Sequence, residues 1–98
     1  MTKLSVVIIT KNEAKNIGNA LESVSWADDI VVVDSGSTDT TIEVARRYTD
    51  RVTVHEWAGY GAQKEYAAGL ASNDWVLSLD ADERISSSLA SEIHDLLQ

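Results

Sequence analysis

Residues 75–84 read Trp75-Val76-Leu77-Ser78-Leu79-Asp80-Ala81-Asp82-Glu83-Arg84, an apolar run that ends in acidic side chains. The run predicts a buried strand, and its carboxylates lie where that strand emerges into solvent. In an extended segment Asp80 and Asp82 share a face, and in a tight turn they converge on one ion. Hard oxygen ligands suit Mg2+ or Mn2+, and Mg2+ takes much of its shell from waters and substrate phosphates. The stretch therefore predicts a divalent cation with a phosphorylated ligand.

Three further apolar segments precede this one. Leu4–Ile9 and Ile30–Val33 hardly alternate, as in strands covered on both faces, whereas residues 51–57 alternate, as in a strand at a sheet edge. Apolar residues at helical spacing follow each strand, over residues 17–24, 41–48, 63–70 and 86–96. The order strand-helix, repeated four times, predicts an α/β fold: a Rossmann-like three-layer sandwich around a mainly parallel four-stranded sheet.

Polar clusters follow three of the four strands, at residues 10–13, 34–39 and 80–83. An Asp-x-Asp pair by itself is most often a solvated acidic turn, so its place in the chain matters. In open parallel sheets, ligands bind outside the carboxyl ends of the strands, where the strand order reverses. We therefore expect the three clusters to share one crevice.

Composition narrows the function classes. The 98 residues make one small domain with a formal net charge of −8, and the eight basic residues are scattered, which argues against nucleic-acid binding. The chain has no Cys, which excludes disulfides and thiolate metal sites. No apolar run approaches the ~20 residues of a membrane span, and the first residues do not form a signal peptide. We expect a cytoplasmic protein without a transmembrane segment.

Three segments resemble the signatures of the inverting family 2 glycosyltransferases with the GT-A fold: Val7–Glu13, Val31–Asp39 and Leu79–Asp82. Ser25–Asp29 and Gly59–Lys64 extend the resemblance to the bacterial lipopolysaccharide core biosynthesis glycosyltransferases. The resemblance implies a transferase that binds a nucleotide-diphosphate sugar, with UDP-sugar as the expected donor. It also implies a saccharide or lipid-linked acceptor for the full-length protein, which would be peripheral at the inner membrane.

The same resemblance implies roles for residues of the nucleoside pocket. Thr10, Asn12 and Glu13 would line it, and Asp34 would hydrogen-bond the base or the ribose.

Further roles at the diphosphate come from the resemblance as well. Gln63 and Lys64 would lie near the nucleotide and its phosphates. Asp80 would contact the ribose and the metal, and Asp82 would ligate the Mg2+ or Mn2+ that bridges the diphosphate. A divalent cation and a nearby Lys would stabilise the charge on the leaving nucleoside diphosphate.

Family members run well beyond this length and carry the acceptor site and the catalytic base in their second half. Glu83 belongs to the metal turn, and Glu92 and Asp95 lie on a helix expected to face solvent. We therefore interpret residues 1–98 as a truncated donor-binding part of a GT-A domain without a catalytic base. The last strand would then have an open edge, which favours a homodimer; a monomeric mass in sedimentation at high micromolar concentration would count against it.

Two rival functions remain open from the sequence. A receiver-like signalling domain needs an acidic pair after the first strand, where this chain has Thr10 and Asn12. A non-catalytic nucleotide or metal-binding module shares every feature of the donor half. The histidines show no metal-ligand spacing. The simplest role for Trp26, Trp57 and Trp75 is packing, and Trp57, beside a glycine turn, has stacking on a sugar or base as its alternative.

The donor-half interpretation predicts little or no transferase activity from these residues alone, because the acceptor hydroxyl has no base to deprotonate it. A coupled assay for released nucleoside diphosphate checks this. Acceptor-dependent turnover by the 98-residue chain would contradict it.

Overall fold

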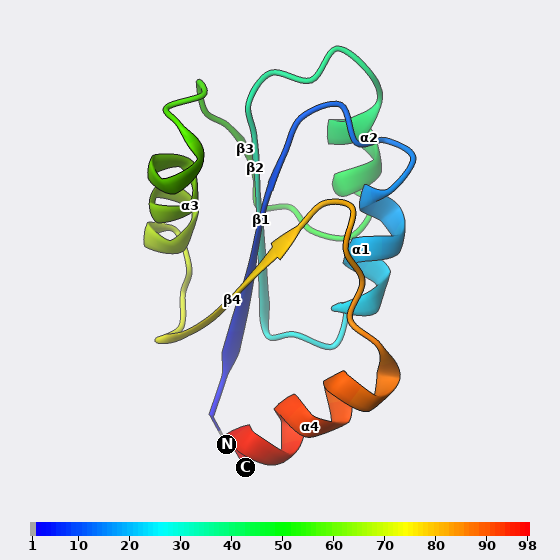
Figure 1. Ribbon diagram of the computed structural model, residues 1–98, viewed down its shortest axis with the longest axis vertical. Helices are drawn as coiled ribbons and strands as arrows, with labels where there is room; N and C mark the ends of the chain where they lie inside the picture. Colours follow the sequence, from blue (N-terminus) through cyan, green and yellow to red (C-terminus); the bar gives the residue numbers. More distant parts are fainter. Residues whose placement is uncertain (1) are drawn as a thin grey trace.

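The computed structural model describes residues 2–98. Strands and helices alternate along the chain, as the sequence predicts (Figure 1). In order they are β1 (Leu4–Thr10), α1 (Ile17–Ser23), β2 (Asp29–Asp34), α2 (Thr41–Ala45), β3 (Val52–Val54), α3 (Tyr60–Gly69), β4 (Trp75–Asp80) and α4 (Ser87–Leu97). No helix in this part of the chain is both long enough and apolar enough to cross a membrane.

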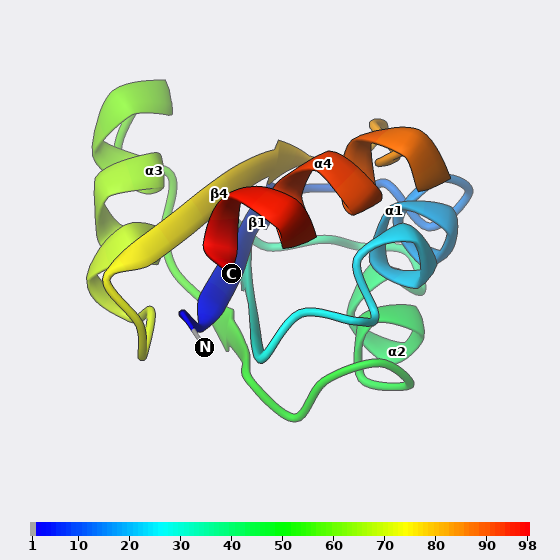
Figure 2. The same cartoon turned by 90° about the horizontal axis from the view of Figure 1, so that it is seen from below.

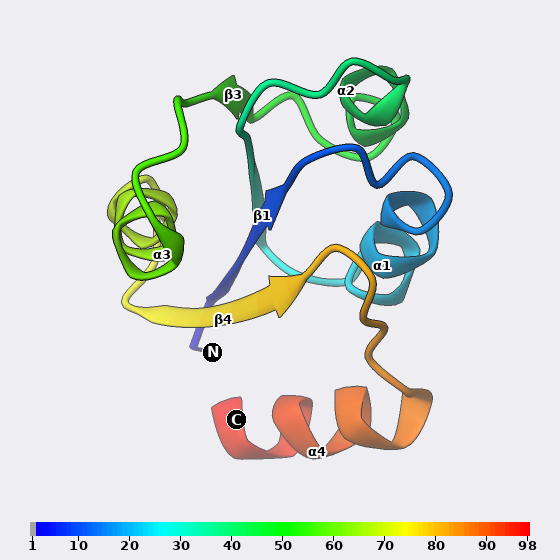
Figure 3. The same ribbon diagram turned by 45° about the horizontal axis from the view of Figure 1, so that its top comes forward.

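All four strands are parallel and lie in the order β3-β2-β1-β4. Helices α1 and α2 cover one face and α3 covers the other, which confirms the three-layer α/β fold (Figure 3). The chain adds β2 and then β3 on one side of β1, and crosses the sheet through α3 to place β4 on the other side. The strand order therefore reverses between β1 and β4, which is where ligands bind in such sheets.

Burial of β1 and β2 explains why their sequences do not alternate. Val6 and Ile8 pack against α1 and α2, while Val7 packs against Ala67 of α3. Successive side chains of a strand point to opposite faces, so a strand covered on both faces needs apolar residues throughout.

The edges of the sheet confirm one prediction and correct another. Strand β3 lies at an edge, as its alternation predicts, although it is shorter than expected. Strand β4 forms the other edge, as predicted for the last strand, but it is not the buried strand that its apolar run predicts, since Trp75 is 60% exposed and Val76 37% exposed. The strand joins the core from its middle onward, through partly buried Leu77, buried Leu79 and the following Ala81. The first two apolar residues of β4, Trp75 and Val76, are therefore not explained by packing against the core.

The tryptophans divide in the same way. Trp26 packs at the rim of the core, its indole N–H donates to the Ser23 carbonyl (2.9 Å), and its ring contacts His94 with centroids 4.6 Å apart. Trp57 and Trp75 are 52% and 60% exposed, so the predicted packing role is wrong for both. Helix α4 supplies His94 and lies beside the amino end of β1, where the Thr2 N–H donates to the Leu97 carbonyl at 3.3 Å (Figure 2).

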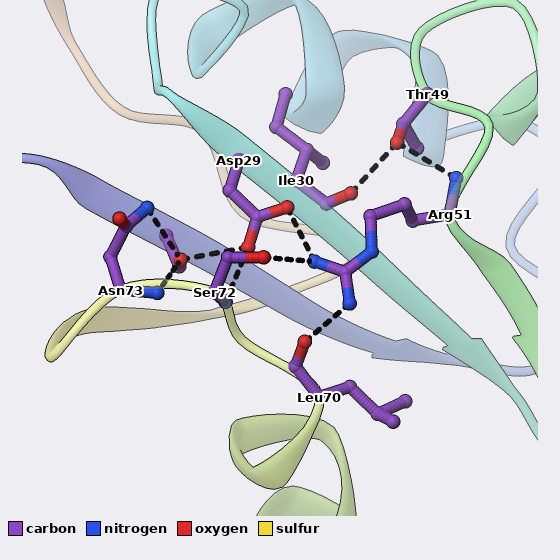
Figure 4. A network of polar contacts seen from close by, with 8 residues as sticks. Asp29, Ile30, Thr49, Arg51, Leu70, Ser72 and Asn73 are labelled. Carbon is purple, nitrogen blue, oxygen red and sulfur yellow. Dashed lines mark hydrogen bonds and ion pairs between the residues drawn. The ribbon is translucent and has the colours of Figure 1, made fainter.

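A polar network ties the amino ends of the strands together (Figure 4). Asp29, at the start of β2, pairs with Arg51 (2.6 Å) and accepts hydrogen bonds from the Ser72 N–H (2.9 Å) and the Ser5 hydroxyl (2.8 Å). Arg51 also donates to the Leu70 carbonyl. Burial works to raise the pKa of Asp29, but the hydrogen bonds from Ser72, Arg51 and Ser5 outweigh it and hold the pKa below its ordinary value.

We predict that Asp29→Asn lowers the free energy of unfolding by about 1–3 kcal/mol near neutral pH, because it removes the charge at the centre of this network. A carboxyl whose folded-state pKa is lowered stabilises above its unfolded pKa of about 3.9 and loses this as the pH falls through the folded value. Urea unfolding should show the full difference from wild type at pH 6 and a smaller one below about pH 4. Exposed Asp74→Asn is the matched control, and a difference that is the same at both pH values would contradict the assignment.

Candidate functional site

A cleft of about 260 Å³ lies at the carboxyl ends of the strands, where the strand order reverses between β1 and β4. The loops after β1 and β4 leave the sheet in the same direction (Figure 3). The cleft is lined by Ile9, Thr10, Lys11, Glu13, Ser35, Trp57, Tyr60, Asp80, Ala81 and Asp82. Residues from all three predicted polar clusters therefore reach one cleft.

Hydrogen bonds join the loop after β1 to the loop after β2. The Asn12 side-chain carbonyl accepts from the Thr38 N–H (2.8 Å), and the Asn12 N–H donates to the Ser37 hydroxyl (2.8 Å). The Glu13 N–H donates to the Thr41 hydroxyl (2.9 Å). Asn12 has a φ of +53°, a left-handed conformation that Asn adopts more readily than most residues. Asn12 is exposed and does not line the cleft; it holds two cleft-forming loops together.

Asp39 belongs to the same loop contacts. The Thr41 hydroxyl donates to Asp39, and with the N–H groups of Thr41 and Ala14 it holds the pKa of Asp39 below its ordinary value. These hydrogen bonds favour the charged form of Asp39 in the folded protein.

Asp34 lies beneath the cleft, not on its surface. Its side chain is fully buried, and its carboxylate accepts from the N–H groups of Gly36 (2.9 Å) and Ser37 (2.7 Å) and from the Ser37 hydroxyl (2.5 Å). Gly36 has a φ of +105°, which suits glycine at this turn. In this arrangement Asp34 shapes the loop that carries Ser35 into the cleft. Its predicted contact with a base or ribose stays a prediction.

Gln63 is also fully buried and faces β3. Its amide N–H donates to the His55 carbonyl (3.0 Å), and its amide oxygen lies 3.0 Å from His55 Nδ1. Because the Gln63 nitrogen donates to a carbonyl, its oxygen is the acceptor, and His55 Nδ1 carries the hydrogen. The His55 ring stacks on Tyr66, with centroids 3.7 Å apart. Gln63 thus anchors α3 and, with it, the neighbouring Lys64.

Asp80 lies at the centre of the charged side of the cleft. The Tyr60 hydroxyl donates to Asp80 Oδ1 (3.0 Å), and Lys64 Nζ lies 3.8 Å from the same oxygen. Lys64 also lies over the Tyr60 ring, 4.6 Å from its centroid. The Tyr60 side chain, with help from the charges of Asp80 and Glu83, raises the pKa of Lys64 above its ordinary value, so Lys64 is a cation at neutral pH.

The turn after β4 orients the acidic residues. The Glu83 carboxylate accepts from the Asp80 N–H (2.9 Å), and the Glu83 N–H donates to the Asp80 carbonyl (2.9 Å). Asp82 is exposed and lines the cleft, and its carboxylate makes no hydrogen bond or ion pair to residues 2–98. Glu83 therefore closes the turn and leaves Asp82 free to face the cleft.

The donor set fits a divalent cation that is shared with a ligand. Within residues 2–98 no group of three or more His, Cys, Asp or Glu side chains could hold a metal by itself. Asp80 and Asp82 supply hard oxygen atoms, which suit Mg2+ or Mn2+ when ligand phosphates and waters complete the shell.

Thr10 supplies an independent indication of a ligand. Its side chain is 7% exposed and lines the cleft, and its hydroxyl is the buried polar side-chain atom in residues 2–98 that lacks a hydrogen-bond partner. Leaving such a group unsatisfied costs about 1–3 kcal/mol, which a hydrogen-bonding ligand would recover.

Tyr60 is a cleft residue that the sequence did not predict, whereas Ser35 belongs to the predicted cluster of residues 34–39. Ser35 and Tyr60 line the cleft, and Trp57 lies there and in an adjoining hollow with Lys11 and Ser35. The spacing of Tyr60 and Lys64, four residues apart and directly after a glycine turn, could have indicated that both face the same side of α3.

Comparison with known proteins places this fold in a family. The model of the family described as Glycosyl transferase family 2 matches residues 5–97. An uncharacterized glycosyltransferase of Rickettsia felis is 48% identical over 94 residues, which are 95% of this chain and 33% of that protein. The lipopolysaccharide core biosynthesis glycosyltransferase LpsC of Rhizobium meliloti is 38% identical over 96% of this chain and 37% of its own length. The chain thus spans about a third of the curated relatives it matches.

The fold also matches a solved enzyme. Glucosyl-3-phosphoglycerate synthase from Mycobacterium tuberculosis, crystallised with Mg2+ and uridine diphosphate, superposes with a TM-score of 0.79 at 27% identity. The match covers 99% of this chain and 40% of that one. The four-stranded parallel sheet with its helices is the arrangement found in GT-A glycosyltransferases.

We predict that Asn12→Ala lowers the free energy of unfolding by about 1–2 kcal/mol. It removes the side-chain oxygen that accepts from the loop after β2, and it places alanine at a positive φ that asparagine tolerates better. Asn12→Gly should cost about 1 kcal/mol less, since glycine tolerates this φ. Urea unfolding measures both variants, and amide exchange at Thr38 should accelerate in each. Unchanged Thr38 exchange would show that Asn12 does not join the loops.

Proposed function

The chain belongs to glycosyl transferase family 2, and on that premise we propose that residues 1–98 form the donor-binding part of a GT-A glycosyltransferase. The donor is a nucleotide-diphosphate sugar, with a UDP-sugar as the first choice. One observation carries the proposal: Asp80 and Asp82 line one cleft with Thr10, whose hydroxyl is unsatisfied, at the point where the strand order reverses. Lys64 contacts Asp80 from outside this lining.

The two ends of the cleft suit the two ends of such a donor. Thr10, which ends β1, and Glu13, in the loop that follows, lie on the side where the nucleoside would bind, and Thr10 offers it an unsatisfied hydroxyl. Asp80 and Asp82 would hold Mg2+ or Mn2+ at the diphosphate. Lys64 is a cation close enough to reach the same phosphates. A bound cation supplies positive charge that stabilises the departing nucleoside diphosphate, which is where charge develops in glycosyl transfer.

Trp57 extends the proposal to the base. It is 52% exposed, lines the cleft and its adjoining hollow with Lys11 and Ser35, and has a large aromatic face that water covers in the free protein. A stacked uracil would bury that face, and stacking of a base on an aromatic ring contributes about 1–3 kcal/mol. Binding should therefore quench Trp57 fluorescence, with Trp57→Phe as the variant that removes the signal.

Relatives support the choice of donor and acceptor. The Mycobacterium tuberculosis neighbour binds uridine diphosphate with Mg2+, and LpsC of Rhizobium meliloti is a lipopolysaccharide core biosynthesis enzyme. We propose a saccharide of a lipopolysaccharide core as the acceptor of the whole protein. The acceptor site and the base that deprotonates the acceptor hydroxyl would be supplied by sequence outside these residues.

We predict that UDP binds the 98-residue chain at least ten times more tightly with Mn2+ than with EDTA, because the cation offsets the repulsion between the diphosphate and the acidic cleft. Asp82→Asn should weaken Mn2+-dependent UDP binding about tenfold, since it removes a ligand oxygen charge. Isothermal titration calorimetry measures both effects.

Asp74→Asn is the matched control for this titration, because Asp74 is exposed and lies at the opposite end of β4. Urea unfolding checks that each variant is folded. UDP binding that is equally tight in EDTA, or unchanged by Asp82→Asn, would contradict the proposed metal-dependent donor site.

A further inference from the structure

Two side chains of α3 hold the carboxylate that the proposed function assigns to the metal. Tyr60 donates a hydrogen bond to Asp80 Oδ1 at 3.0 Å, and Lys64 Nζ approaches the same oxygen to 3.8 Å. Lys64 also lies 4.6 Å from the centroid of the Tyr60 ring, so the three side chains contact one another. Neither Tyr60 contact was expected from the sequence.

Helix α3 holds Tyr60 and Lys64 in fixed positions beside Asp80. Tyr60 and Lys64 are four residues apart at the start of the helix, so they project from the same side. Between them Gln63 is buried and bonded twice to His55, which holds this turn of the helix against the segment after β3. Asp80 is held in turn by the backbone contacts of Glu83.

Charge gives this contact a role. Four carboxylates lie around the end of β4 and the loop after β1, those of Glu13, Asp80, Asp82 and Glu83. Lys64 forms an ion pair with one of them, Asp80, and Lys11 lines the same cleft. Without a bound cation, Lys64 offsets part of their mutual repulsion. A divalent cation bound to Asp80 would lie within a few ångströms of the Lys64 ammonium group, and the two positive charges would repel each other.

We propose that Tyr60 and Lys64 form a latch that occupies Asp80 in the ligand-free protein, so that a divalent cation must compete with Lys64 for this carboxylate. The inference rests on the proposed donor site. Lys64 becomes available to the diphosphate once it leaves Asp80, so that the cation and the nucleotide each favour binding of the other. Tyr60 is the positioning residue of the latch, because it contacts both Asp80 and Lys64.

The test separates the two parts of the latch by measuring Mn2+ binding in the absence and in the presence of UDP. Electron paramagnetic resonance counts free Mn2+, and calorimetry measures UDP binding at saturating Mn2+. The variants are Lys64→Met, which keeps the aliphatic stem without the charge, and Tyr60→Phe, which keeps the ring without the hydroxyl. Lys3→Met is the charge-matched control, because Lys3 is exposed at the amino end of β1.

Lys64→Met should bind Mn2+ alone about two to five times more tightly than wild type, the range expected for loss of an exposed ion pair. The same variant should bind UDP about tenfold more weakly at saturating Mn2+, since a charge-assisted contact to phosphate is lost. Tyr60→Phe should tighten binding of Mn2+ alone by about twofold and should not weaken UDP binding, because its hydroxyl serves only the latch. Lys3→Met should behave as wild type.

Unchanged or weaker binding of Mn2+ alone by Lys64→Met would overturn the latch, and wild-type UDP binding with Mn2+ would then still support the donor site. A wild-type chain that binds neither Mn2+ nor UDP would overturn both proposals. Loss of UDP affinity in Tyr60→Phe equal to that in Lys64→Met would assign Tyr60 to ligand contact and exclude it from the latch.

Discussion

The burial of β1 and β2 on both faces is the constraint on which this structure depends. Val6, Val7, Val31 and Val32 are almost completely removed from water, with α1 and α2 on one side of the sheet and α3 on the other. Parallel strands need a crossover between each pair, and these crossovers are the covering helices. Because all strands point the same way, every strand end that carries a polar cluster opens at the same edge of the sheet.

The amino ends and the carboxyl ends of the strands are stabilised by different interactions. At the amino end, the Asp29–Arg51 pair and its partners join the starts of the strands, and α4 lies beside the start of β1. At the carboxyl end, side chains such as Asn12 and Asp34 satisfy the backbone N–H groups of the loops. One end is therefore closed by bonds among strands, while the other is left with Thr10 unsatisfied and Asp82 facing the cleft.

Polar residues near the cleft have two kinds of role. Asp34, Gln63 and Asn12 form hydrogen bonds within the protein. Asp34 thereby positions Ser35, Gln63 positions Lys64, and Asn12 positions the loop after β1. Glu13, Asp80 and Asp82 lie on the cleft itself. The first group makes the second possible, because a small domain has few buried side chains with which to hold exposed loops in place.

By itself the sequence determined the order of the elements, because strand and helix periodicity are local properties of the residues. The strand-helix alternation then implied the parallel sheet, and a parallel sheet places the three polar clusters at the same ends of the strands. The tertiary structure alone decided that the apolar side chains at the start of β4, such as Trp75, are exposed, and that Asp34 and Gln63 turn inward. It also decided that Trp57 and Tyr60 reach the cleft and that Lys64 contacts Asp80. These outcomes depend on which elements pack beside one another, and an apolar or polar residue looks the same in the sequence whichever neighbour it meets.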